Sequence, residues 1–135
     1  MQDCQADYRN LDRVYVPLDA LAAVGAKVEE LGHAQSSPAL RECLRGLAVR
    51  TGKLLDQSAP FSPLIGDFRL AMEVAVIQSL ARRLVAMLTT RDPLSERVHL
   101  GAAGFAAVGI LGMVQGLALR LLRPAIAAPM GNKIP

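Results

Sequence analysis

Apolar residues recur every three or four positions along most of this chain, which is typical of amphipathic helices. Residues 38–57 carry one apolar stripe with the charged side chains outside it, as a surface helix does. Residues 63–90 are apolar on nearly every side between Leu70 and Leu80. This pattern predicts a central helix that is buried on most sides. A third long helix is predicted at residues 94–122, where no charged residue occurs between Leu100 and Leu119.

Each of these three helices is preceded by a capping residue and a proline: Ser37-Pro38, Ser62-Pro63 and Asp92-Pro93. The side-chain oxygen accepts a hydrogen bond from a free N–H of the first turn, and proline has the helical φ already set. We therefore expect helix starts at these three places. Upstream, the pattern predicts a helix over residues 1–11, an extended run at 13–17, a short helix at 18–24 and a polar connector at 27–35. The predicted fold class is all-α.

Composition limits the class of protein. The 135 residues suffice for one domain, and 52% hydrophobic residues with 20% charged residues exclude an intrinsically disordered chain. The net charge of +3 comes from scattered arginines with few aromatic residues between them, so we expect no nucleic-acid partner. Cys4 and Cys43 are far apart, which excludes a zinc ribbon and a disulfide scaffold and fits the reducing cytoplasm.

The uncharged run at residues 100–119 is a rival signal. As a helix it would rise about 30 Å, which is enough to cross a bilayer. Gly112 and Gly116 would allow close packing against a neighbouring helix. The run consists largely of Gly and Ala, which contribute little to membrane insertion, so a span is not the favoured interpretation.

Two acidic residues near the start are the strongest candidates for chemistry. Asp3 and Asp7 are one helical turn apart, which places their Cβ atoms about 5 to 6 Å from each other on one face. Such a pair can bind Mg²⁺ together with substrate phosphates, although the spacing alone favours a solvated helix face. Cys4 is expected to be a small buried hydrophobic residue. His33 and His99 have no second ligand at metal-binding spacing, so we expect them to be solvated or capping residues.

The segment from Gln2 to Asp19, QDCQADYRNLDRVYVPLD, resembles the second aspartate-rich motif of the squalene and phytoene synthase family. Residues 92–100, DPLSERVHL, resemble the start of the last core helix in its bacterial hydroxysqualene synthase branch, which serves hopanoid biosynthesis. The likeness extends from residue 2 to about residue 120. It implies the C-terminal half of an isoprenoid synthase helical bundle. In that fold, two aspartate-rich helices face each other across a cavity and hold Mg²⁺ against a prenyl diphosphate.

The resemblance implies specific roles. Asp3 and Asp7 would be magnesium ligands, and Arg13 and Tyr15 would bind the substrate, with Tyr15 beside the reacting chain as a catalytic residue. The implied reaction converts presqualene diphosphate to hydroxysqualene and diphosphate. Farnesyl diphosphate remains an alternative substrate, and squalene or a carotenoid precursor remains an alternative product.

The other aspartate-rich motif of the family has no counterpart between Leu18 and Pro135. We therefore expect a partial synthase domain at residues 1–123, a disordered tail at 124–135 and little or no catalysis by the isolated chain. The expected partners are a separate N-terminal half and, because the family's substrates are lipids, the surface of the inner membrane. The alternative hypothesis is a small non-catalytic helical protein, membrane-associated or interacting with other proteins, in which the aspartates have no role.

Overall fold

The computed structural model describes residues 1–122, and this part of the chain is helical without any β-strand. The predicted all-α class is therefore confirmed. The helices are α1 (Cys4–Leu11), α2 (Leu18–Ala23), the 3₁₀ helix η1 (Val28–Gly32), α3 (Pro38–Ser58), the 3₁₀ helix η2 (Ser62–Leu64), α4 (Phe68–Thr90) and α5 (Ala102–Leu121). The tail predicted at 124–135 lies outside the described residues.

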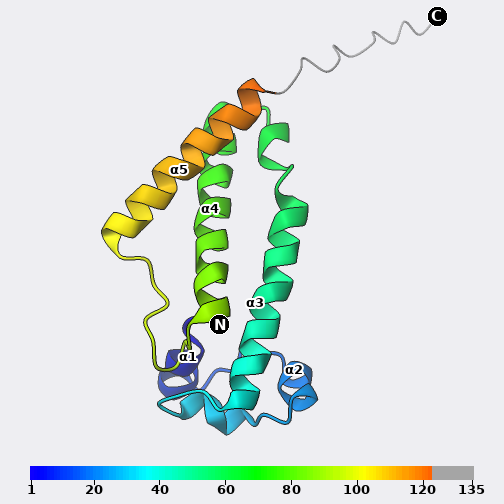
Figure 1. The fold of residues 1–135 in the computed structure, drawn as a ribbon, viewed down its shortest axis with the longest axis vertical. Coiled ribbons are helices and arrows are strands. Elements are labelled where there is room, and N and C mark those ends of the chain that lie inside the picture. Colours follow the sequence, from blue (N-terminus) through cyan, green and yellow to red (C-terminus); the bar gives the residue numbers. More distant parts are fainter. Residues whose placement is uncertain (123–135) are drawn as a thin grey trace, which may run out of the picture.

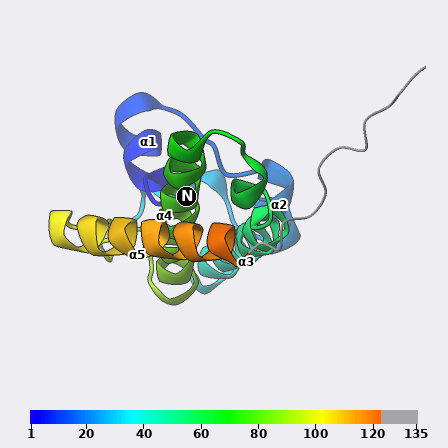
Figure 2. The same ribbon diagram turned by 90° about the horizontal axis from the view of Figure 1, so that it is seen from above.

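The long helices α3 and α4 run antiparallel, and α5 crosses α4 obliquely (Figure 1). The short elements α1, α2 and η1 gather at the end of the pair where α3 begins. Viewed from above, α5 lies across one side of α4 (Figure 2). We call α1, α2 and η1 the base, and the antiparallel pair α3 and α4 the hairpin. Helix α5 packs against α4 on the outer side of the hairpin.

The predicted start of α3 is correct, whereas the start of α4 was predicted too early. Ser37 caps α3 by accepting a hydrogen bond from the N–H of Leu40 at 3.1 Å. Ser62-Pro63 opens only η2, because the Ser62 hydroxyl donates to the Ala71 carbonyl at 2.9 Å instead of capping a helix. Asp67 caps α4 through the N–H of Leu70 at 2.7 Å.

The expected helix start at Asp92-Pro93 is also wrong. Asp92 is 4% exposed and receives hydrogen bonds from the N–H and hydroxyl of Ser36 and from the N–H of Leu94. It therefore closes a single turn and joins it to the loop before α3. Helix α5 begins only at Ala102, after Gly101 in an extended conformation. The connector at 27–35 likewise contains the 3₁₀ helix η1, which the sequence pattern did not predict.

Two clusters of buried side chains hold the base together. The first joins α1, α2, η1 and α3, and its members include Cys4, Val16, Leu21, Leu31, Leu40, Leu44 and Leu94. The second joins α3, the end of α4 and the segment that follows, through Ala48, Met87, Leu88 and Val98. Since Cys4 belongs to the first cluster, α1 is fixed on the base rather than tethered loosely to it.

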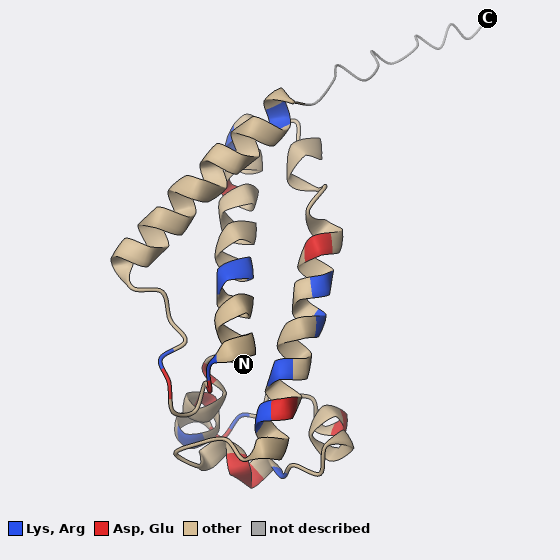
Figure 3. Ribbon diagram, viewed as in Figure 1, with Lys and Arg blue, Asp and Glu red and all other residues tan. Residues whose placement is uncertain are grey.

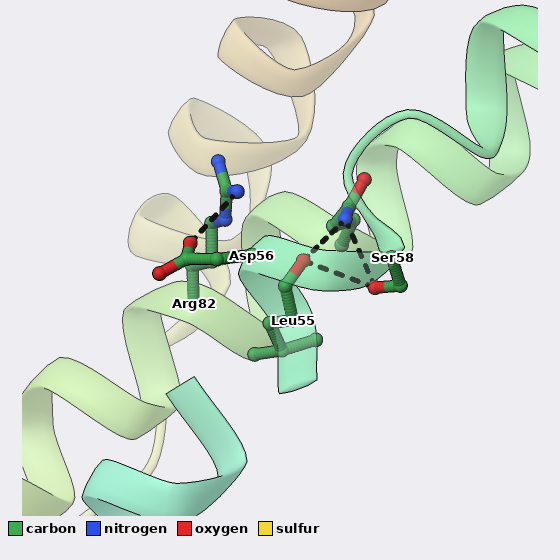
Figure 4. A network of polar contacts seen from close by, with 5 residues as sticks. Leu55, Asp56, Ser58 and Arg82 are labelled. Carbon is green, nitrogen blue, oxygen red and sulfur yellow. Dashed lines mark hydrogen bonds and ion pairs between the residues drawn. The ribbon is translucent and has the colours of Figure 1, made fainter. Parts of the chain in front are cut away.

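At the far end of the hairpin, polar contacts connect α3 and α4 (Figure 4). Arg82 donates to Asp56 at 3.1 Å, and the Gln78 amide donates to the carbonyl of Leu55 at 3.0 Å and to the hydroxyl of Ser58 at 3.3 Å. These contacts fix the helices relative to each other where few apolar side chains are buried.

Helix α4 is less enclosed than predicted. Within the described residues it packs against α3 and α5, while Ile77 remains 63% exposed. The prediction of close packing by the glycines of α5 is correct, because Gly112 and Gly116 are both buried against α4. The opposite side of α5 is apolar and exposed.

Candidate functional site

Helix α1 is held so that its two candidate aspartates point away from its anchors. The Arg9 guanidinium donates to the Gly32 carbonyl at 2.9 Å, and the Gln5 amide donates to the His33 carbonyl. On a helix of about 3.6 residues per turn, Asp3 and Asp7 lie on roughly the opposite side. Asp3 is exposed and Asp7 is half-buried. Helical spacing thus leaves both residues on the side of α1 away from these contacts, and their joint binding of a metal stays a prediction.

Asp3 has a partner that the sequence did not indicate. It occupies the N-cap position of α1 without making a side-chain cap hydrogen bond. Its Oδ1 instead lies 3.1 Å from Nε2 of His99, 96 residues further along the chain. His99 is half-exposed, as expected, but it is paired rather than free. The sequence pattern could not predict this contact, because the two residues are far apart in the chain and meet only because α4 runs antiparallel to α3 and ends at the base.

Arg13 and Tyr15 follow directly after α1. Asp12 adopts a left-handed conformation with φ of 49°, and the N–H groups of Asp12 and Arg13 both donate to the Asp7 carbonyl. This turn brings the Arg13 guanidinium to 3.4 Å from the Tyr15 hydroxyl. Both side chains are exposed, and within residues 1–122 no hydrogen bond joins either of them to the carboxylates. Arg13 is therefore linked to Asp7 by a backbone hydrogen bond, and Tyr15 is linked to Arg13 by a side-chain hydrogen bond.

The donor groups of α1 fit a magnesium ion that is shared with a phosphorylated substrate. Mg²⁺ takes oxygen ligands and is usually held by one or two carboxylates, with phosphate oxygens and water at the remaining positions. Asp3 and Asp7 supply such carboxylates on one face. Residues 1–122 contain no cluster of three or more acidic, histidine or cysteine side chains that could hold a metal without a substrate.

Cys4 is not part of this donor set. Its side chain is 4% exposed, and burial raises the pKa of the thiol. A neutral thiol facing the core is a poor ligand for a hard cation. The prediction that Cys4 is a small buried hydrophobic residue is therefore confirmed.

An apolar surface runs along α4. A groove of about 580 Å³ between α4 and α5 is lined by Phe68, Arg69, Met72, Glu73, Val76, Ile77, Leu80, Phe105 and Met113. A smaller hollow of about 150 Å³ is lined by Gln2, Leu80, Leu84, His99, Leu100 and Phe105. Leu80 and Phe105 line both hollows, so the apolar surface extends from the start of α4 to His99, the partner of Asp3.

Comparison with known proteins identifies the class to which this helical chain belongs. Residues 1–103 match the squalene/phytoene synthase family, and the chain belongs to that family. It is 62% identical over 100 residues to the hydroxysqualene synthase of Rhodopseudomonas palustris, a match that covers 74% of this chain and 34% of the relative.

Two further relatives carry the same name. The hydroxysqualene synthase of Sinorhizobium fredii is 47% identical over 120 residues, which is 89% of this chain and 41% of the relative. That of Zymomonas mobilis is 48% identical over 117 residues, which is 82% of this chain and 39% of the relative. The chain therefore spans little more than a third of the length of the curated relatives it matches. No solved structure matches it.

Proposed function

We propose that this chain carries the second aspartate-rich helix of a synthase that converts presqualene diphosphate to hydroxysqualene and diphosphate. The observation that carries the proposal is the contact of Asp3, at the start of α1, with His99, which lines the apolar surface along α4; Asp7 lies one helical turn further along α1. The identity of 47 to 62% to proteins named hydroxysqualene synthase supports this substrate and product over those of other family members.

The residues would divide the work as follows. Asp3 and Asp7 would hold Mg²⁺, which when bound neutralises charge on the diphosphate as a Lewis acid. Arg13 would donate charge-assisted hydrogen bonds to the same phosphate oxygens. The bond between the substrate carbon and the diphosphate oxygen breaks with its electron pair leaving on diphosphate. The cation left behind rearranges with opening of its cyclopropane ring, and water then bonds to the carbon that carries the positive charge after rearrangement and releases a proton. Tyr15 lies beside Arg13, where it would line the reacting end of the hydrocarbon chain.

The test joins this chain to the preceding part of the Rhodopseudomonas palustris relative and measures release of diphosphate from presqualene diphosphate. We expect Asp3→Asn and Asp7→Asn each to abolish release. Asp12→Asn is the matched control, because Asp12 closes the same helix and asparagine tolerates its left-handed backbone. Release that persists undiminished in both Asp3→Asn and Asp7→Asn would refute the proposal.

The remaining part of the synthase would cover the exposed side of α5. Only Arg120 is charged on this helix, and its large apolar side chains away from α4 are exposed (Figure 3). A soluble protein rarely leaves so large an apolar surface open to water. Since the relatives are more than twice as long as the matched segment, their remaining helices are the occupant that we propose.

A second candidate role for the same helix is contact with the inner membrane. α5 is long and apolar enough to cross a membrane, judged by length and composition, and little of it is buried within the described residues. Flotation with vesicles of phosphatidylglycerol and phosphatidylethanolamine separates the two roles. If the joined protein floats as completely as the isolated chain, α5 binds lipid; if joining abolishes flotation, protein covers it.

A further inference from the structure

The contact between His99 and Asp3 is held in place by the core on both sides. Asp3 directly precedes Cys4, which is 4% exposed, and His99 directly follows Val98, which is 1% exposed. Cys4 and Val98 belong to the two core clusters of the base. The backbone positions of both partners are therefore set by buried neighbours, although both side chains are about half-exposed.

His99 restrains the Asp3 carboxylate through one oxygen and leaves the other oxygen able to bind a metal ion. His99 Nε2 lies 3.1 Å from Asp3 Oδ1 and, as the protonated ring nitrogen, would donate to it. Asp3 makes no cap hydrogen bond that would otherwise fix its side chain. Its second oxygen, Oδ2, is not engaged by His99. In known metal sites, removing a donor that hydrogen-bonds to a metal-binding carboxylate lowers metal affinity by roughly 10- to 100-fold.

We propose that His99 is a positioning residue, which orients Asp3 so that Oδ2 faces the magnesium ion and the substrate diphosphate. This inference rests on the proposed function, because it requires Asp3 to be a ligand. It goes beyond that function by including the segment between α4 and α5 in the metal site. Asp3 and Asp7 would then differ as metal ligands, since His99 orients only Asp3.

The test measures Mn²⁺ as a spectroscopic substitute for Mg²⁺. The 135-residue chain, dispersed in mild non-ionic detergent, is titrated with Mn²⁺ in the presence of inorganic diphosphate, and free Mn²⁺ is followed by electron paramagnetic resonance. His99→Ala is expected to weaken binding by about tenfold. His99→Gln places an amide N–H near the position of Nε2 and is expected to restore affinity to within about threefold.

The controls separate positioning from folding. His33→Ala removes the other histidine, whose backbone carbonyl accepts from Gln5 on the side of α1 away from Asp3, and should leave affinity unchanged. Circular dichroism and urea unfolding of the His99 variants show whether a loss of binding follows a loss of structure. If His99→Gln binds as weakly as His99→Ala while both remain folded, the hydrogen bond is not what matters and the inference is overturned.

Failure of the inference is distinct from failure of the proposed function. If Asp3→Asn and Asp7→Asn weaken Mn²⁺ binding but His99→Ala does not, the metal site stands and His99 has no positioning role. If neither aspartate variant changes binding, the metal site itself is refuted and the inference fails with it.

Discussion

Asp92 stands where the loop before α3 meets the turn after α4. Its carboxylate receives hydrogen bonds from the N–H and hydroxyl of Ser36, from the N–H of Leu94 and from the hydroxyl of Ser95. Burial by itself raises the pKa of this carboxyl, but the hydrogen bonds outweigh burial and lower the pKa below its ordinary value. A charged acid is thus stabilised inside the base by four donors rather than by a cation.

Replacing Asp92 by Asn should destabilise the fold by about 2 kcal/mol near neutral pH, because the amide cannot accept from all of these donors. The charged form contributes this stability above the pKa of the unfolded chain, near 4, and the contribution is lost as pH falls through the lower pKa of the folded state. The gap between wild type and variant should therefore shrink between pH 6 and pH 3 in urea unfolding experiments. Asp56→Asn, at an exposed ion pair, should change stability by less than about 1 kcal/mol. A gap that widens on acidification would contradict this account.

The two cysteines should be unreactive in the folded chain. Both thiols are buried, and burial raises the pKa of each, so little thiolate is present at pH 8. Alkylation by iodoacetamide, followed by mass spectrometry, should therefore be slow at Cys4 and Cys43 until urea is added. An Ala6→Cys variant offers a matched control, because Ala6 is exposed on the same helix as Cys4. Equal rates at positions 4 and 6 would show that α1 does not pack on the base.

At the scale of elements, sequence reasoning identified the three long helices but misplaced the starts of two of them. A Ser or Asp before Pro is a valid capping signal, yet the signal cannot tell whether the side chain is needed elsewhere. Ser62 donates to the Ala71 carbonyl and Asp92 binds Ser36, so neither caps the long helix that follows. Both competing partners come from tertiary structure, which a local pattern does not contain.

The packing of α5 on α4 depends on glycine. A Cβ added at Gly112 would lie 2.7 Å from Ser79 Oγ and 3.0 Å from the Val76 backbone, so Gly112→Ala should push the helices apart at a cost of about 1 to 3 kcal/mol. Hydrogen exchange along α5 should become faster. At Gly104 the added Cβ would meet only a Leu100 methyl group at 3.5 Å, so Gly104→Ala should leave exchange unchanged or slow it through higher helix propensity. Faster exchange in both variants would mean that α5 is not docked through its glycine face.

At the scale of the whole molecule, the sequence revealed only part of the candidate site. The aspartate spacing, Arg13 and Tyr15 all lie within one short segment, so a linear motif could identify them. His99 could not be found in this way, since it reaches Asp3 only after the hairpin of α3 and α4 has returned the chain to the base. The groove between α4 and α5 could not be found in this way either, because it forms only where α5 crosses α4.

The exposed side of α5 provides the last prediction. If the rest of the synthase covers this side, a charge placed there would be buried without a partner on assembly, which is strongly unfavourable. Val114→Glu should therefore weaken association of this chain with the separately expressed preceding part of the Rhodopseudomonas palustris relative by at least about tenfold, measured by calorimetry.

Val49→Glu is the matched control for Val114→Glu. Val49 is likewise exposed, but it lies one turn from Arg45 and from Lys53 on the charged side of α3. A glutamate there would meet water and cations, so association should be unchanged. Equal weakening by the two variants would indicate that general charge rather than burial governs assembly. If neither variant weakens association, the side of α5 bearing Val114 does not contact the remaining helices, and lipid becomes the better candidate to cover it.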